Sequence, residues 1–435
     1  MNFKSSLKLQ KRLHQLIPGG CHTYAKGDDQ FPEFMPPILE KGKGSHVWDL
    51  DGNKYIEYGG GLRSVILGHA FPPIINAVQK QLRLGSNFIR PAKIEYDCAE
   101  EFLQMIEMAD MVKFCKDGSD ATSAAVKLAR AVTGRDIIAI CSSHPFFSVE
   151  DWFIGTTPVS SGIPKVIKEL TVKFEYNNIN SVKEILKKYS NQIAGFILEP
   201  EKNDPPKNNF LHQLKEICHQ NGALFILDEM ITGLRWHNGG AQKLYNIKPD
   251  LSTFGKALGN GFSVSALAGK KEFMELGGLQ HSKKRVFLLS TTHGAENHCL
   301  AAAIANIKFF KENPVIESLN QRGEKLALLI QKSVRELKLE KNFLIIGKPS
   351  CLVYATLNEK MENSQAFRTL LLQELIKRGI LATSLVISFS HTEKDIDITA
   401  EAFHEALFIY KKALNEGIEK FLIGRPVKPV WRAYN

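Results

Sequence analysis

Residues 223–235 read ALFILDEMITGLR, an apolar run that ends in two adjacent acids, Asp228 and Glu229. A short apolar run without alternation is typical of a strand in a parallel sheet that is covered on both faces. Open α/β sheets bind ligands at the carboxyl ends of such strands, so the two acids are candidates for a functional site. Capping of the following segment explains the same acids, and that structural alternative stays open here.

Further apolar runs occur along the central part of the chain. They read MVKFCK at 111–116, IIAICS at 137–142 and IAGFILEP at 193–200. Helical patterns separate them, such as TSAAVKLARAVTG at 122–134. This alternation predicts a large α/β domain over residues 75–309, with a mostly parallel sheet between helices.

Different patterns occur on either side of this central part. In KGSHVWDLDGNKYIEY (43–58), alternating apolar residues surround Asp51 and Gly52, and the glycine supplies the positive φ that a tight hairpin turn requires. We therefore expect an N-terminal arm and a small antiparallel unit over residues 1–74. Helical and strand-like stretches mix later in the chain, which predicts a smaller C-terminal α+β domain over residues 310–435.

Composition narrows the function classes. The 435 residues are 44% hydrophobic and 23% charged, and no window reaches a membrane-spanning length, so we expect a cytoplasmic protein with no membrane partner. The seven cysteines show no CxxC spacing, so we predict neither a metal site nor disulfides. The net charge of +10 makes nucleic acid a candidate partner, but the basic residues are dispersed along the chain. An anionic substrate or cofactor explains the excess equally well, and we predict no nucleic acid.

Lys256 lies in STFGKALGNGF (252–262), where Gly255, Gly259 and Gly261 remove side-chain bulk and let the backbone approach a ligand. A lysine in such a setting forms a Schiff base when desolvation or a nearby cation lowers its pKa. Taken alone, the segment fits a solvated lysine in a flexible loop better. A Schiff-base role for Lys256 is favoured only when its segment is considered together with Asp228, which lies upstream.

Gly118 and Ser119, in KDGSDATSAAVKLARA (116–131), directly precede a long helical pattern. The free N–H groups and positive dipole end of a helix, with a serine hydroxyl, suit a phosphate, whereas an ordinary N-cap needs only the serine or Asp120. A second segment, HPFFSVEDWF (144–153), is an aromatic cluster after an apolar strand. Such a cluster covers a planar ring, packs in the core, or does both.

Taken together and in order, the segments resemble the class III aminotransferases of the pyridoxal-phosphate-dependent fold type I, most closely the glutamate-1-semialdehyde 2,1-aminomutase branch. The similarity runs nearly from end to end. Its carriers are IPGG (17–20), GKGSHVWDLDGNKYIEY (42–58), LGHAFPPI (67–74), DGSDATSAAVKLARAVTGRD (117–136), FILEP (196–200), LDEMITGLR (227–235), FGKALGNG (254–261) and STTHGAENHCLAAA (290–303). The resemblance implies an α/β fold, with a large domain built on a mostly parallel sheet of the seven-stranded type and a smaller α+β domain.

The resemblance also implies pyridoxal 5'-phosphate as cofactor, with pyridoxamine 5'-phosphate as its aminated form. Lys256 is expected to bind the cofactor as a Schiff base and to move protons, and Asp228 to pair with the pyridine nitrogen. The remaining implied contacts are two residues at the phosphate, an aromatic ring on the cofactor face, a carboxylate near the ring and a threonine from a neighbouring subunit: Gly118, Ser119, Phe146, Glu199 and Thr292. A threonine that serves a neighbouring site implies a homodimer with shared active sites.

The chain departs from the aminomutase pattern at several positions. Phe147 stands at the usual histidine position, and Asp117 and Asp120 lie in a phosphate loop where the family usually has Asn or Ser and Glu. Arg63 replaces an uncharged turn, and with Arg90 it offers a second cation for a carboxylate or phosphate on the substrate. Surface salt bridges explain the two arginines equally well.

The sequence thus predicts an aminotransferase that moves an amino group from a small-molecule donor to a keto or aldehyde acceptor, with sugar-derived or anionic molecules as one acceptor class. The alternative is the aminomutase itself, an isomerase that exchanges an amino group and a carbonyl within one molecule. A third reading, a non-catalytic binding protein on the same scaffold, is disfavoured because Lys256, Asp228 and the phosphate loop are retained.

Overall fold

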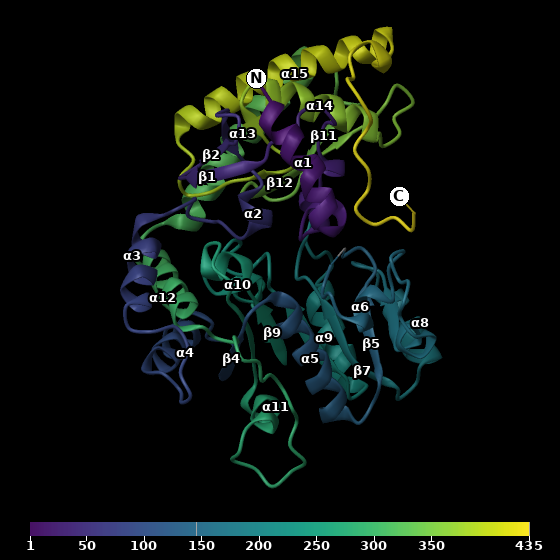
Figure 1. Cartoon of the computed structure of the whole chain (residues 1–435). Coiled ribbons are helices and arrows are strands. Elements are labelled where there is room, and N and C mark those ends of the chain that lie inside the picture. The colour runs from purple at the N-terminus through teal and green to yellow at the C-terminus, as the bar shows by residue number, and fades with distance from the viewer. Residues whose placement is uncertain (145, 435) are drawn as a thin grey trace. The chain divides into compact units, whose positions relative to one another are not determined.

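The structure is a computed structural model that describes residues 1–144 and 146–434. Within these residues the chain forms two compact units, which we call the α/β unit (residues 72–316) and the terminal unit (residues 1–71 together with the chain from Glu317 onward). Figure 1 gives the elements of both. The expected N-terminal segment (1–74) and the expected C-terminal domain (310–435) therefore contribute mainly to one unit.

A sheet of seven described strands forms the centre of the α/β unit. Their order is β4 (Met111–Cys115), β10 (Ser265–Gly269), β9 (Leu251–Phe254), β8 (Leu224–Asp228), β7 (Ile193–Leu198), β5 (Ile137–Cys141) and β6 (Thr171–Phe174). The strands from β9 to β6 run parallel, and β10 is antiparallel to both of its neighbours. The mostly parallel sheet predicted from the sequence is confirmed.

Helices cover both faces of this sheet. The helices of the α/β unit are α3 (Pro72–Leu82), α4 (Lys93–Met105), α5 (Gly118–Thr133), α6 (Asp151–Ile154), α7 (Lys165–Glu169), α8 (Ile179–Lys188), α9 (Phe210–Gln220), α10 (Gly240–Leu244), α11 (Lys271–Met274) and α12 (Asn297–Glu312), with 3-10 turns η4 (Lys256–Gly259) and η5 (Glu275–Gly277). On one face, Phe196 and Phe225 pack with Phe210 of α9. Neighbouring side chains of a strand point to opposite faces, so Gly195 faces α5, where a Cβ would lie 3.3 Å from the Ala129 Cβ. The missing side chain lets α5 pack close to the sheet.

The terminal unit contains two small sheets. One has the order β1 (Leu39–Lys43), β2 (His46–Asp49), β3 (Lys54–Glu57) and β13 (Ile380–Leu381), and the other β11 (Phe343–Ile346), β12 (Cys351–Thr356) and β14 (Leu385–Val386). Its helices are α1 (Lys4–Leu16), α2 (Gly60–Arg63), α13 (Val315–Glu336, which begins two residues before the unit), α14 (Gln365–Lys377) and α15 (Glu393–Glu416), with 3-10 turns η1 (Pro18–Gly20), η2 (Tyr24–Lys26), η3 (Asp28–Gln30) and η6 (Ile418–Lys420). Among the described helices of the whole chain, none combines the length and the apolar character needed to cross a membrane.

The predicted N-terminal hairpin is confirmed. Strands β2 and β3 pair antiparallel, and Gly52 in their turn has a φ of +82°. The hairpin does not form a sheet by itself, because β13 adds a parallel strand through the pairing of Ile380 with Ile56.

Candidate active site

Asp228 ends β8 at the carboxyl edge of the parallel strands, and its residue surface is 2% exposed. Its Oδ1 accepts hydrogen bonds from the backbone N–H of Met230 at 3.0 Å and from Thr253 Oγ1 at 3.1 Å. Burial raises the pKa of this carboxyl, and the positive charge of Lys256 acts in the opposite direction. A further cation beside Asp228 would therefore favour its ionised form.

Lys256 opens η4 directly after β9 and Gly255. Strands β8 and β9 are neighbours, and Asp228 pairs in register with Thr253, so the fold brings Lys256 to the same edge as Asp228. The backbone of Lys256 has a φ of +44°, in the left-handed region that residues other than glycine rarely adopt. Backbone strain of this kind persists where the surrounding structure holds it, and it is frequent at functional sites.

The glycines near these two residues make room for a methionine. A Cβ at Gly255 would lie 2.7 Å from the Met230 Sδ, and a Cβ at Gly118 would lie 3.0 Å from the same sulfur. Met230 is buried and packs with Cys115 and Ala121. Met230 therefore takes the space that Gly255 leaves beside Lys256.

The N-terminus of α5 keeps two donors for an anion. Asp117 caps the helix, because its Oδ1 accepts the N–H of Ser119 at 2.8 Å and that of Asp120 at 3.1 Å. Within the described chain the Gly118 N–H makes no hydrogen bond. Ser119 Oγ accepts the N–H of Val149 at 3.1 Å, which leaves its hydroxyl hydrogen to donate. These donors and the helix dipole suit a phosphate, although the Asp117 carboxylate adds negative charge at the same helix end.

The aromatic cluster divides between surface and core. Phe146 is 43% exposed, and its ring meets Phe153 edge to face with centroids 5.8 Å apart. Phe147 is buried, and its carbonyl accepts a hydrogen bond from Thr122 Oγ1 at 2.8 Å. Phe146 is thus the member of this pair whose ring is accessible to a ligand, and Phe147 belongs to the core.

Sequence reasoning missed His144, which joins two loops at this edge. It is buried, and its Nδ1 accepts the N–H of Glu199, the residue that follows β7, at 2.9 Å. Burial lowers the pKa of His144 to about 3, so the imidazole is neutral at neutral pH and carries its proton on Nε2. The signal available in the sequence was its position between an apolar strand and the aromatic cluster.

Glu229 differs from the adjacent Asp228 in its role. It is fully buried, and its carboxylate accepts the N–H groups of Gln242 at 2.6 Å and Ala241 at 2.9 Å, near the start of α10. Thr232 Oγ1 also donates to it. Burial raises the pKa of Glu229 to about 7. The capping alternative therefore holds for this acid, but the helix it caps is α10 rather than the segment that directly follows.

Replacing this carboxylate tests its capping role. Glu229→Ala is expected to lower the free energy of unfolding by about 2–4 kcal/mol, because it empties a buried site and leaves two N–H groups without an acceptor. Folding raises the pKa of Glu229 from 4.5 to about 7. The wild-type side chain therefore contributes most to the free energy of unfolding below pH 4.5, and this contribution decreases as the pH rises to about 7. That loss amounts to about 3 kcal/mol.

Denaturant unfolding of the wild type and Glu229→Ala at about pH 5 and about pH 8 measures this change. The stability difference between the two proteins should be larger at the lower pH. A difference that grows with pH would contradict the buried, proton-binding role of Glu229.

Thr292 lies on an exposed loop between η5 and α12. Its carbonyl accepts a hydrogen bond from Asn87 Nδ2 at 2.8 Å. Four residues later, Glu296 forms an ion pair with Lys116, which leads into the N-terminus of α5. The ion pair therefore connects the loop that contains Thr292 to the residues just before Gly118, while Thr292 itself remains exposed.

Three side chains of metal-ligand type meet at the start of α12. Ligand atoms of Glu296, His298 and Cys299 lie within 4.8 Å of one another. The Lys116 ammonium already supplies positive charge at Glu296, and burial raises the pKa of the Cys299 thiol, which disfavours the thiolate that a metal requires. The ion pair accounts for this cluster without a metal.

The two candidate substrate arginines belong to different units. In the terminal unit, Arg63 follows Gly60, Gly61 and Leu62 in a turn where all four residues have positive φ, and its Nε donates to Cys351 Sγ at 3.3 Å. In the α/β unit, Arg90 is exposed before α4, and it pairs with no carboxylate in the part of the chain that the structure describes. The salt-bridge alternative therefore does not apply to Arg90.

Comparison with known proteins gives one family for nearly the whole chain. A family model described as aminotransferase class-III matches residues 24–407. The chain is 31% identical over 432 residues to a glutamate-1-semialdehyde 2,1-aminomutase from Alkaliphilus metalliredigens, covering 94% of this chain and 97% of that protein. It is also 31% identical over 419 residues to a 3-aminobutyryl-CoA aminotransferase from Cloacimonas acidaminovorans, covering 94% and 98%.

One solved structure supports the fold class. A structure described as a transaminase with PLP bound aligns with a TM-score of 0.86 at 24% identity, over 96% of this chain and 99% of that chain. This likeness confirms the fold expected from the sequence.

Proposed function

Because this chain belongs to the class III aminotransferase family and is therefore an enzyme, we propose that it transfers an amino group from a small-molecule donor to a keto or aldehyde acceptor, with pyridoxal 5'-phosphate as its cofactor. The observation that carries the proposal is the meeting of Lys256 and the buried Asp228 at the carboxyl edge of β8 and β9. Edges of this kind are the usual ligand sites of α/β sheets.

The residues of this edge fit the cofactor. Asp228 suits a protonated pyridine nitrogen, because a neighbouring cation favours the ionised carboxylate and so opposes the effect of burial, which raises its pKa. The Gly118 N–H and the Ser119 hydroxyl suit a phosphate, and the exposed ring of Phe146 suits a planar ring. When bound, pyridoxal phosphate supplies an electron sink for the charge released at the α-carbon of the substrate.

Each side chain then has a defined task. Lys256 Nζ would hold the cofactor and would move a proton between the substrate carbon and the cofactor carbon. Asp228 is fixed by Met230 N and Thr253 Oγ1, so its carboxylate is oriented before a cation arrives. Glu199 would lie near the cofactor ring, and His144 holds the Glu199 backbone in place through the hydrogen bond from its N–H.

Substrate recognition and assembly are part of the same proposal. Arg90, and Arg63 on its strained turn, are proposed to bind a carboxylate or phosphate of the substrate. The exposure of Thr292 supports a homodimer in which this residue serves the neighbouring site. Six of the seven cysteines are buried thiols, which supports a reducing compartment such as the cytoplasm.

Half-reactions test the proposal against the aminomutase alternative. Holoenzyme mixed with single amino donors is expected to convert its bound cofactor to the amine form and to release about one keto acid per site without an acceptor. Absorbance and product analysis measure both events. Glutamate 1-semialdehyde without any donor is expected to give no sustained formation of 5-aminolevulinate. Repeated turnover under that condition would replace the aminotransferase by the isomerase.

A further inference from the structure

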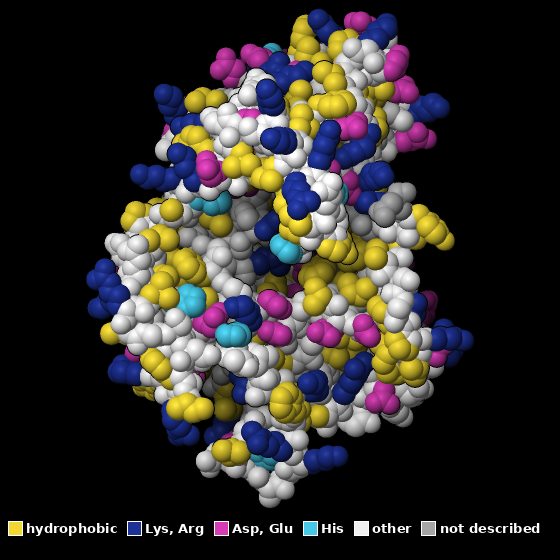
Figure 2. All heavy atoms as spheres, in the orientation of Figure 1, with side chains coloured by type: hydrophobic (Ala, Val, Ile, Leu, Met, Phe, Trp, Pro, Cys, Tyr) yellow, Lys and Arg dark blue, Asp and Glu magenta, His cyan; other side chains and the backbone are white. Residues whose placement is uncertain are grey.

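The loop after η5 borders a cavity of about 640 Å³ with a strongly basic lining. The charged residues of the lining are Lys127, Arg130, Lys283, Lys284, Arg285 and one acid, Glu272. Figure 2 shows Lys and Arg side chains on this loop, which lies below α11 in Figure 1. The cations come from α5 and the loop, whereas α11 contributes Glu272 and Phe273, so the positive charge lies on two segments rather than along one helix.

Few acidic groups of the described chain act on these cations: the Asp136 carboxylate favours the charged form of Arg130, and Glu272 is the one acid in the lining. Among residues 1–144 and 146–434, none of the five forms an ion pair with a carboxylate. Lys127 Nζ donates to the carbonyl of Phe287 at 3.1 Å, and Arg130 Nε donates to the carbonyl of Asp136 at 2.7 Å. Like charges around one cavity repel one another, so a bound anion would stabilise this arrangement.

Two lysines elsewhere in the α/β unit form ion pairs with carboxylates. Lys311 pairs with Glu101 at 2.7 Å and Lys243 pairs with Glu107 at 2.5 Å. Burial also lowers the pKa of Arg130, which reflects the cost of holding its charge partly away from water.

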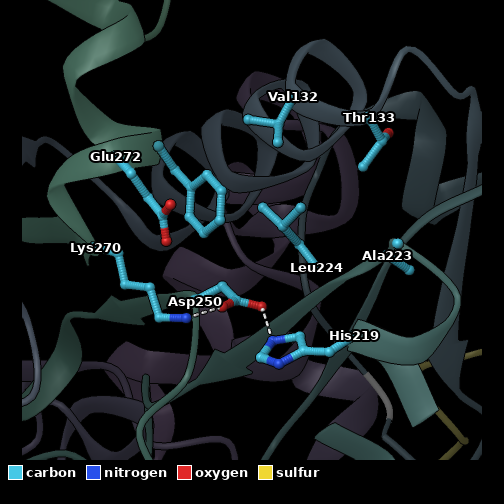
Figure 3. Close-up of a pocket in the computed structure, with 10 residues that line it drawn as sticks. Val132, Thr133, His219, Ala223, Leu224, Asp250, Lys270 and Glu272 are labelled. Carbon is cyan, nitrogen blue, oxygen red and sulfur yellow. Dashed lines mark hydrogen bonds and ion pairs between the residues drawn. The ribbon is translucent and has the colours of Figure 1, made fainter. Parts of the chain in front are cut away.

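A second cavity of about 330 Å³ adjoins the first and shares Val132, Glu272 and Phe273 with it. Figure 3 shows Lys270 and His219 directed at Asp250 in its wall. Lys270 Nζ lies 2.6 Å from Asp250 Oδ1, and His219 Nε2 lies 2.9 Å from Asp250 Oδ2. Fixed polar groups next to apolar side chains are typical of small-molecule sites.

The second cavity lies at the far end of β8 from the candidate active site. Leu224 begins β8 in the wall of the second cavity, whereas Asp228 ends the same strand. The strand rise places the two ends about 13 Å apart. The second cavity and Asp228 are therefore at opposite ends of this strand.

We propose that the two adjoining cavities form a binding site for a nucleotide, with its phosphates at Lys283, Lys284 and Arg285 and its base against Phe273. Guanidinium and ammonium groups donate charge-assisted hydrogen bonds to phosphate oxygens. The ring of Phe273, which lines both cavities, gives a reason for a base in addition to phosphate. This site is separate from the proposed aminotransferase chemistry and does not depend on it.

Calorimetric titration of ADP into the holoenzyme tests the proposal, with pyrophosphate and adenosine as separate probes. Lys283→Ala/Lys284→Ala is expected to weaken ADP binding by at least about tenfold, because two charge-assisted contacts are lost. The control Lys187→Ala/Lys188→Ala removes two exposed lysines from α8 and the same net charge. It should change the affinity by less than about twofold. Thermal unfolding establishes that both variants are folded.

Phe273→Ala distinguishes a nucleotide from bare phosphate. It should weaken ADP and adenosine binding but leave pyrophosphate within about twofold. Absence of ADP binding, equal weakening by the α8 control, or loss of cofactor absorbance on adding ADP would each overturn the proposal. Binding of a single-stranded oligonucleotide in place of ADP would also overturn it and assign the surface to nucleic acid. A changed sedimentation coefficient of the Lys283→Ala/Lys284→Ala variant would assign the cavity to a subunit contact instead.

Discussion

Lys256→Ala is expected to remove the visible absorbance band of the bound cofactor and to lower kcat by at least about 10³-fold. Alanine has no amine to bind the cofactor and no group to move the proton. The fold should change little, since alanine faces the same left-handed backbone, with its φ of +44°, that lysine adopts here. Spectra of both proteins after addition of pyridoxal phosphate, followed by a donor half-reaction, measure the two losses.

Lys248→Ala is the matched control for this substitution. Lys248 also lies in the α/β unit, and its Nζ pairs with Asp110 at 3.4 Å on the surface. Its loss should leave the spectrum unchanged and kcat within about twofold. An undiminished band in Lys256→Ala would mean that another amine holds the cofactor.

Asp228→Asn is expected to lower kcat by about 10²–10³-fold, because a neutral amide no longer stabilises positive charge on the cofactor ring. The change keeps the size of the side chain, and its remaining oxygen can still accept from Met230 N and Thr253 Oγ1. Single-turnover rates with a donor and titration of cofactor affinity separate the effect on chemistry from the effect on binding.

Asp136→Asn provides the same change in net charge at an exposed position between α5 and β5. Its kcat should remain within about twofold of the wild type. Equal losses in both variants would attribute the effect to net charge, and a loss below about tenfold in Asp228→Asn would contradict the role of Asp228.

Local patterns predicted the parts of the fold that depend on neighbouring residues. The apolar run before Asp228 forms a strand buried on both faces, and Gly52 forms the hairpin turn. No local pattern in the sequence indicates the pairing of Ile380 with Ile56. A strand of two residues carries too little pattern to be recognised, and its partner lies far away in the sequence.

In the candidate site, too, local patterns predicted some residues, whereas the roles of others depend on residues far away in the sequence. Asp228 and Lys256 could be selected because strand ends and glycine-rich turns are visible in sequence. The different roles of Asp228 and Glu229 were not visible, because the N–H groups that Glu229 accepts lie 12 and 13 residues later. His144 depends on the backbone of Glu199, 55 residues away, so its position could be assigned only once β5 and β7 were known to be neighbours.

The order of strands in the sheet has a consequence for biosynthesis. Strand β4 leaves the ribosome before the other strands of its sheet, yet its neighbour in the described sheet is β10, which ends at Gly269. At typical rates of translation, roughly 10–30 s separate the two strands. During that interval the N–H and C=O groups of β4 are open to other nascent chains, and the charge of Lys113 in the middle of the strand opposes such aggregation.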